Sequence, residues 1–161
     1  MKNIINVNDI EWQESPHENF SHFRKSLSSN SAGKMIGTSL YKLLPGNKAF
    51  PYHCHYGNEE AIFILSGSGT LRLGDERIII KENDYVALPL GREHAHQVIN
   101  TSNEELIYLC ISTMIIPDVM EYPDSDKVGI MTGSPPGGEK TKKRQEFYQK
   151  NSAVSYFKDE K

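Results

Sequence analysis

The chain has 161 residues, which is enough for one folded domain with a buried core. Its formal charge of −3, from 18 basic and 21 acidic residues, argues against a nucleic-acid-binding surface. Two cysteines form no disulfide framework, the N-terminus lacks the apolar stretch of a secretory signal, and no apolar run is long enough to span a membrane. We therefore expect a cytoplasmic, soluble protein without nucleic-acid or membrane partners.

Short apolar segments separated by turn residues fill the middle of the chain. Residues 1–34 are polar, and we interpret them as an N-terminal arm that adds an edge strand to the fold. From residue 35 onward, the predicted strands cover residues 35–44, 60–65, 70–73, 77–80, 85–88, 97–99 and 105–116. Turn residues such as Pro45-Gly46-Asn47 and Gly74-Asp75-Glu76 stand between them.

Strands of this length and spacing predict an all-β fold, an antiparallel barrel of about six to eight strands. We expect the barrel between residues 35 and 116 and a C-terminal extension over residues 117–161. Within this extension, residues 139–150 are polar and are predicted to form one short helix before the tail. The segment 35–44 is interpreted as an apolar edge strand that would pair with a second copy, so we expect a homodimer.

The most informative motif is His53-Cys54-His55, in which two histidines stand two residues apart. On a β-strand such residues share one face, with about 6.6 Å between them. Two imidazoles so placed can converge on one metal ion, whose Zn–N distance is roughly 2.1 Å. A metal site is therefore the leading hypothesis for the function of this chain.

Further ligands are available near this pair in the sequence. A turn at residues 56–58 would bring a carboxylate, Glu59 or Glu60, back on the neighbouring strand. The second pair, His94-Ala95-His96, can supply a third imidazole. Three neutral imidazoles and one carboxylate would suit one divalent transition metal ion (Mn, Fe, Ni, Co or Zn) and would suit Mg or Ca poorly.

These residues resemble the first conserved motif of the cupin superfamily. The motif reads Gly46, six residues, His53-x-His55, four residues, Glu60, six residues and Gly67. Glu59 satisfies the shorter variant of the gap, but only Glu60 places Gly67 after six residues. The resemblance therefore implies His53, His55 and Glu60 as metal ligands.

The second cupin motif is also present, with one departure. It reads Asn83-Asp84, Pro89-x-Gly91, a histidine and Asn100, where Asn83 stands in place of the usual glycine. Asparagine is the next-best residue for a left-handed turn, so the departure is mild. His94 fits the spacing from Gly91, whereas His96 fits the gap to Asn100.

We choose His96 as the fourth ligand, because Ala95-His96-Gln97 resembles the sequence that many small cupins place before the asparagine. His94 would then lie one strand step further out, as a candidate substrate contact at the barrel mouth. Tyr108, on a strand near the motifs, is the other candidate catalytic residue. His94 can equally be read as an exposed rim residue, and for Tyr108 a structural place in the core or at the rim is the more usual reading.

The resemblance implies the cupin double-stranded β-helix, a jelly-roll-like antiparallel barrel, as found in small single-domain bacterial cupins related to mannose-6-phosphate isomerase. Because this fold hosts many activities, it does not fix one of them. We expect a metal-dependent enzyme, of the isomerase, dioxygenase or decarboxylase type, acting on a small polar metabolite such as a sugar derivative or a keto or hydroxy acid. The alternative is a non-catalytic or regulatory module that binds a small molecule. Small cupins commonly form dimers, which agrees with the expected homodimer.

Overall fold

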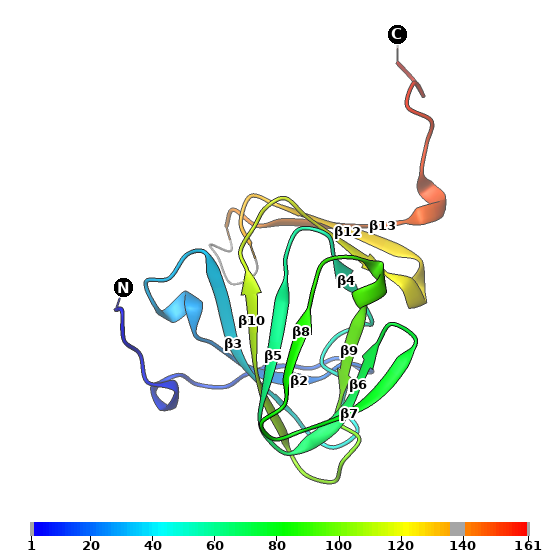
Figure 1. Ribbon diagram of the computed structural model, residues 1–161. Helices are drawn as coiled ribbons and strands as arrows, with labels where there is room; N and C mark the ends of the chain where they lie inside the picture. Colours follow the sequence, from blue (N-terminus) through cyan, green and yellow to red (C-terminus); the bar gives the residue numbers. More distant parts are fainter. Residues whose placement is uncertain (1, 136–140, 161) are drawn as a thin grey trace.

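The protein is a β-sandwich in the computed structural model, which describes residues 2–135 and 141–160 (Figure 1). The first sheet has the strand order β1 (Gln13–Ser15), β2 (His22–Ser26), β3 (Ile36–Leu43), β10 (Leu106–Thr113), β5 (Glu60–Ser66) and β8 (Tyr85–Leu88). A second sheet has the order β7 (Glu76–Lys81), β6 (Ser68–Leu73) and β9 (His96–Ile99). A third has the order β13 (Arg144–Gln149), β12 (Lys127–Thr132), β11 (Asp118–Tyr122) and β4 (Cys54–His55).

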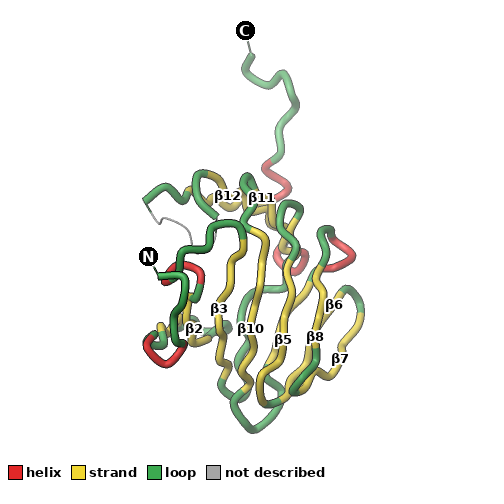
Figure 2. The backbone as a smooth tube through the Cα atoms, turned by 60° about the vertical axis from the view of Figure 1, so that its left-hand side comes forward, coloured by secondary structure: helices red, strands yellow, loops and turns green. Residues whose placement is uncertain are grey.

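Backbone bridges join the second and third sheets at the point where the two histidine motifs meet. His53 and His96 form an antiparallel bridge, as do Lys48 and Ile99. Through them β9 lies beside the segment that leads into β4, so the two smaller sheets continue one another. The sheet of β11, β12 and β13 lies across one end of the barrel (Figures 1 and 2).

The apolar faces of the strands meet in one core between the sheets. Tyr108 lies opposite Tyr41 in the β3–β10 register, and their rings stack with centroids 5.4 Å apart. Burial of such side chains is the main stabilising contribution to a fold of this size. The buried core residues are Tyr41, Leu43, Ala49, Ile62, Ile64, Leu71, Ile80, Leu88, Val98, Leu106 and Tyr108.

The predicted all-β fold is confirmed, and the barrel strands differ from their predicted ranges only near the ends. Within residues 35–116 the structure has the eight strands β3 to β10. The N-terminal arm also adds strands as predicted, because β2 pairs with β3 and β1 pairs with β2. Asn83 has φ 73°, the left-handed conformation that its place in the motif requires.

The prediction that residues 35–44 form an open edge is wrong. β3 is paired on both sides, with β10 and with β2. The reason is that the polar arm contributes β2, whose register from Phe23–Lys42 to Ser26–Ser39 covers residues 39–42 of this edge. A second copy therefore cannot pair with β3 along residues 39–42.

The predicted helix over residues 139–150 is also wrong. Residues 139 and 140 lie outside the described part, and the remaining residues of that range do not form an α-helix. Arg144–Gln149 is β13, which pairs antiparallel with β12. In this register Phe147 lies opposite Gly129, and a Cβ on Gly129 would come within 2.9 Å of the Phe147 ring. Gly129 thus leaves room for the aromatic ring because it has no side chain. Backbone pairing with β12 makes this polar segment a strand, although its composition predicted a helix.

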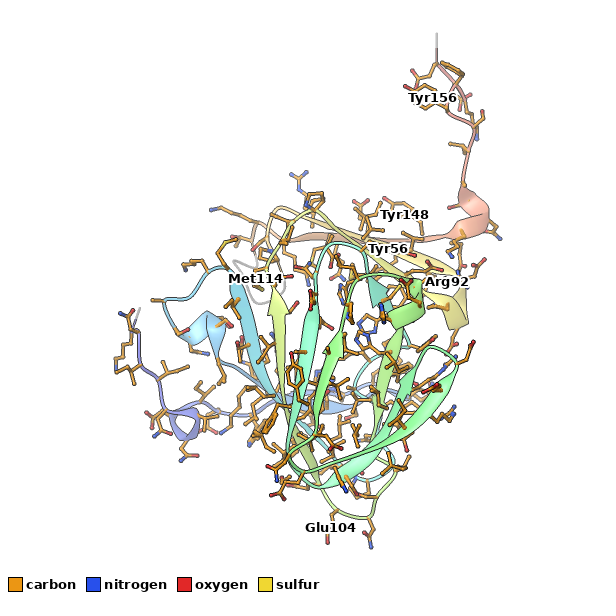
Figure 3. The ribbon with its side chains drawn as sticks, in the orientation of Figure 1. Tyr56, Arg92, Glu104, Met114, Tyr148 and Tyr156 are labelled. Atoms are coloured by element: carbon orange, nitrogen blue, oxygen red, sulfur yellow. The ribbon has the colours of Figure 1, made fainter. Side chains whose placement is uncertain are left out.

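The helical segments of the described residues are short 3-10 turns, and none of them could cross a membrane. They are η1 (Val7–Asp9), η2 (Ser28–Asn30), η3 (Arg92–His94), η4 (Pro123–Ser125) and η5 (Lys150–Ser152). After η5 the chain stands away from the barrel, and Tyr156 lies on this tail (Figure 3). The tail aromatic Tyr156 is 88% exposed.

The buried carboxylate of Glu121 on β11 holds several segments together at this end of the barrel. It accepts a hydrogen bond of 2.6 Å from the hydroxyl of Tyr56 and forms an ion pair with Arg92 of η3. Tyr56 and Arg92 are both labelled in Figure 3. Lys150 of η5 also pairs with Glu121, at 2.5 Å. These contacts connect the β4–β5 turn, η3 and the C-terminal extension.

Candidate metal centre

Three histidines and one glutamate converge inside one end of the barrel. The His53 and His96 backbones exchange two hydrogen bonds, of 3.1 and 2.7 Å, which brings their rings to a centroid distance of 4.8 Å. His55 follows on β4, with its ring 5.1 Å from that of His53. Glu60, at the start of β5 in the opposite sheet, completes the group, so both sheets contribute to it.

Donor atoms of His53, Glu60 and His96 lie close enough to share one ion, whereas His55 contacts Glu60 but is not one of these three. Glu60 Oε2 lies 3.3 Å from His96 Nε2 and 3.8 Å from His55 Nε2. One donor atom each from His53, Glu60 and His96 lie within 4.8 Å of one another. These separations are what a single ion would span with ligand distances of roughly 2 Å.

All three imidazoles are oriented through Nδ1. His53 Nδ1 lies 2.8 Å from the carbonyl oxygen of Pro51, and His96 Nδ1 lies 3.1 Å from that of His94. His55 Nδ1 lies 2.6 Å from Asp118 Oδ2. Because these partners are acceptors, each Nδ1 carries a hydrogen, so in the neutral form of each imidazole the lone pair is on Nε2. Metal-binding histidines are commonly oriented in this way.

Asp118 is a part of the site that the sequence analysis missed. Its side chain is fully buried on β11, where Oδ2 accepts from His55 and Oδ1 accepts a 3.0 Å hydrogen bond from the Gly57 backbone. It lies in the C-terminal extension, 63 residues after its histidine partner. No local pattern in the sequence points to it, since only the pairing of β11 with β4 brings the two together.

For His53 and Glu60, electrostatics favour the protonation states that metal binding requires. Burial lowers the pKa of His53 to about 3, and the neighbouring His96 and His55 act in the same direction. Burial alone would raise the pKa of Glu60, but its hydrogen bond with His96 and the nearby His55 hold that pKa at about 2. At neutral pH His53 is therefore a neutral imidazole and Glu60 an anion.

His55 differs from His53 because of its carboxylate partner. Burial opposes the charged imidazole, but the hydrogen bond to Asp118, together with the charge of Glu60, leaves the pKa of His55 raised. The pKa of Asp118 is lowered, since its hydrogen bond with His55 outweighs the opposing effect of burial. His55 is thus the ligand candidate whose basicity is set by a partner outside the group.

The structure places the alternative residues in different surroundings. Glu60 faces the histidines, whereas Glu59 is an exposed residue whose backbone N–H donates to Thr113 Oγ1. His94 lies on η3 with 36% of its side chain exposed, and its Nε2 lies 3.9 Å from Glu93. Its contact with the group is the carbonyl that orients His96.

The group opens into a cavity of about 300 Å³. Tyr108 lines this cavity, while His94 is absent from its described lining. Burial raises the pKa of Tyr108 well above its ordinary value, with Tyr41 adding to the effect, so the hydroxyl stays protonated. Other lining residues are Phe50, Ile62, Val98, Met120, Tyr122 and Met131, and Tyr122 stacks on His53 with ring centroids 5.8 Å apart.

The donor set fits a transition metal. Imidazole nitrogens with one carboxylate suit Mn, Fe, Co, Ni or Zn, whereas Ca and Mg prefer sites built from oxygen. A site lined on one side by a ligand-sized cavity also has the open character of a reactive centre. The residues present therefore fit a single ion with room for a further ligand.

Comparisons with known proteins agree with this fold. A crystal structure of a proposed sugar phosphate isomerase from Acidithiobacillus ferrooxidans superposes with a TM-score of 0.81 at 24% identity, covering 96% of both chains. A sugar phosphate isomerase from a cupin superfamily, from Silicibacter pomeroyi, gives 0.78 at 19% identity, covering 95% of this chain and 97% of that one. At these identities the similarities show the fold alone.

The match to one curated relative covers only part of each chain. Quercetin 2,3-dioxygenase from Bacillus subtilis is 38% identical over 58 residues, which is 35% of this chain and only 17% of the dioxygenase. The model of the cupin domain matches residues 39–112, the segment that carries both histidine motifs. The chain thus carries a cupin domain over residues 39–112, with a His53–Glu60–His96 group where a metal ion can be held.

Proposed function

We propose that this protein is a metal-dependent enzyme acting on a small polar metabolite, with His53, His55, Glu60 and His96 binding one divalent transition ion. The observation that carries the proposal is the common orientation of the three imidazoles. Each is fixed through Nδ1, so that the free nitrogens face the Glu60 carboxylate and the cavity.

The cavity supports small-molecule chemistry at this centre. Its volume of about 300 Å³ is at the low end of the range for ligand pockets, which suits a small metabolite such as a sugar derivative or a keto or hydroxy acid. A divalent transition metal would supply Lewis-acid polarisation of an oxygen atom or a place for dioxygen. Isomerase, dioxygenase and decarboxylase reactions all use such chemistry.

A second function, binding without turnover, is favoured by the other groups in the cavity. Burial raises the pKa of Tyr41 and Tyr108, and it raises that of the Cys110 thiol as well. These lining groups stay protonated near neutral pH and cannot act as general bases. If the reaction needs a base outside the ligand set, the protein would instead hold a metabolite for regulation.

We expect turnover of at least one small substrate only when the metal is bound. The measurement is a screen of metal-loaded and metal-free protein against sugar phosphates and small keto and hydroxy acids, following product formation and thermal shift together. Metal-dependent turnover supports the enzyme. A thermal shift without turnover supports the binding module, and metal-independent turnover would contradict both.

We also propose a cytoplasmic homodimer. Apolar side chains at the start of β3 and after β10 are exposed: Met35, Ile36, Ile115 and Ile116. Their backbones are neighbours, since Met114 N–H donates to the Met35 carbonyl at 3.1 Å. An exposed apolar cluster of this kind is a common contact surface between copies of a chain.

For the dimer we expect light scattering to give twice the 18.2 kDa mass of the chain at micromolar concentration. Met35→Lys with Ile115→Lys should lower the mass toward one chain, because two buried charges would face each other across the contact. Ile79→Lys with Tyr85→Lys serves as the control, since it changes two other exposed apolar residues. A single-chain mass for the unmodified protein would contradict the proposal.

A further inference from the structure

Two basic side chains reach the metal cavity from the segments outside the central barrel. Arg24 comes from β2 in the N-terminal arm, and Lys143 lies directly before β13 in the C-terminal extension. Both line the cavity that contains His53 and Glu60. Although Lys143 is an exposed residue, partial burial of its ammonium group and then the charge of Arg24 lower its pKa. The two positive charges are therefore near enough to affect each other.

Arg24 is held in place through Nε, and no described residue is a hydrogen-bond partner of its terminal nitrogens. Its Nε donates a 3.0 Å hydrogen bond to Ser39 Oγ, and the guanidinium carbon lies 5.8 Å from the centre of the Tyr41 ring. Within the described part of the chain, neither Arg24 nor Lys143 forms an ion pair with a carboxylate. The terminal N–H groups of Arg24 are left to bind something else, and a guanidinium fork matches a carboxylate or phosphate group.

The surroundings of Arg24 are rich in hydroxyl groups. A recess of about 50 Å³ adjoins the metal cavity, and the two share Arg24, Tyr41, Glu60 and Cys110 in their linings. The recess is also lined by Ser26, Ser28, Thr38, Ser39 and Ser112. Arg24 thus stands at the junction between the metal centre and a pocket of hydrogen-bonding groups.

The charges of the lining favour an anion. Of the described lining residues, Glu60 is the carboxylate, and it already pairs with His96. Arg24 and Lys143 oppose it with two positive charges, and a divalent ion would add two more. A neutral ligand would leave these charges uncompensated in a partly enclosed space, whereas a ligand with an oxyanion group would balance them.

We propose that Arg24 and Lys143 form an anion-binding subsite of the metal cavity, so that the ligand is a small metabolite whose carboxylate or phosphate group is held by both cations. The inference deepens the proposed function, because it assigns the substrate class of the same site. Its residues lie outside the metal-ligand set, so the subsite can be tested with and without the metal.

The experiment is calorimetric titration of Mn²⁺-loaded and metal-free protein with two pairs of probes that differ in charge. Glucose 6-phosphate is compared with glucose, and lactate with propane-1,2-diol. We expect at least one charged probe to bind about tenfold or more tightly than its neutral partner, and the pair that responds tells phosphate from carboxylate. The preference should persist in the metal-free protein.

The variants locate the effect. Arg24→Gln with Lys143→Gln should remove the charge preference while leaving metal content unchanged, whereas Arg77→Gln with Lys81→Gln, which removes two charges from β7 outside the cavity, should retain it. Lys143→Gln alone, at an exposed residue, guards against loss of folding and should weaken binding severalfold. Thermal unfolding checks each variant.

Two outcomes overturn the inference: charged probes that bind no more tightly than neutral ones, or a preference that survives in the Arg24 and Lys143 variants. If the protein binds no metal but still prefers charged probes through Arg24 and Lys143, the proposed function fails and the anion subsite stands. If it binds metal without any charge preference, the subsite alone fails.

Discussion

Replacing His96 with alanine is expected to abolish binding of the metal, whereas replacing His94 with alanine should leave metal content unchanged. His96 Nε2 lies 3.3 Å from Glu60, and its Nδ1 is engaged by a carbonyl, so its free nitrogen faces the centre. His94 contributes only that carbonyl, which alanine retains. The loss in His96→Ala should exceed the roughly 10- to 100-fold that removal of an outer partner of a metal ligand costs.

Elemental analysis of the purified proteins, followed by metal titration, measures this difference. His55→Ala and Glu60→Gln belong to the same series and should also lose the metal, while Glu59→Gln provides the matched control beside Glu60. Circular dichroism should show that every variant keeps its β-structure. Metal loss in His94→Ala but not in His96→Ala would reverse the assignment of the second motif, and unchanged metal content throughout would remove the site.

The fold could be predicted because the strands are bounded by residues with strong local preferences. Glycines and prolines mark the turns, and the His53–His55 spacing places both imidazoles on one face of a strand. Even Asn83, the departure from the motif, adopts the left-handed conformation expected of it. Four candidate ligands could therefore be named from local patterns and one family resemblance.

The rest depended on pairing between distant segments. Arg144–Gln149 has the composition of a solvated helix, but it becomes a strand because β12 offers an edge and Gly129 accommodates Phe147. Asp118 and Arg24 reach the centre only because both extensions pack onto the barrel. Periodicity and spacing describe one segment at a time, and they carry no information about which strands will meet.

Replacing Asp118 with asparagine is expected to weaken metal binding by about 10- to 100-fold without removing the site. The carboxylate accepts the Nδ1 hydrogen of His55 at 2.6 Å, which orients the ring and makes Nε2 a stronger donor. An amide of the same shape can still accept a hydrogen bond, but it lacks the negative charge. Metal titration on the alkaline side, at a pH where the affinity of both proteins no longer changes with pH, measures this loss.

Asp118→Asn should weaken metal binding but make it less sensitive to acid. This combination distinguishes a role of Asp118 in orienting His55 from a merely structural one. In the unmodified protein the raised pKa of His55 means that protons begin to displace the metal at a comparatively high pH as the solution is acidified. Without the Asp118 charge, burial of His55 is opposed mainly by Glu60, so the pKa of His55 should fall. The variant should therefore bind metal more weakly on the alkaline plateau, yet its affinity should begin to fall only at a lower pH than that of the unmodified protein.

Glu121→Gln is the control for both measurements. Glu121 is a second buried carboxylate on β11, but it pairs with Arg92, Lys150 and Tyr56 rather than with a candidate ligand. The Glu121→Gln substitution should lower the thermal stability of the protein and leave its metal affinity and the pH profile of metal binding unchanged. If Asp118→Asn behaved like Glu121→Gln, with stability reduced and both metal properties intact, the carboxylate would serve the fold and not the metal centre.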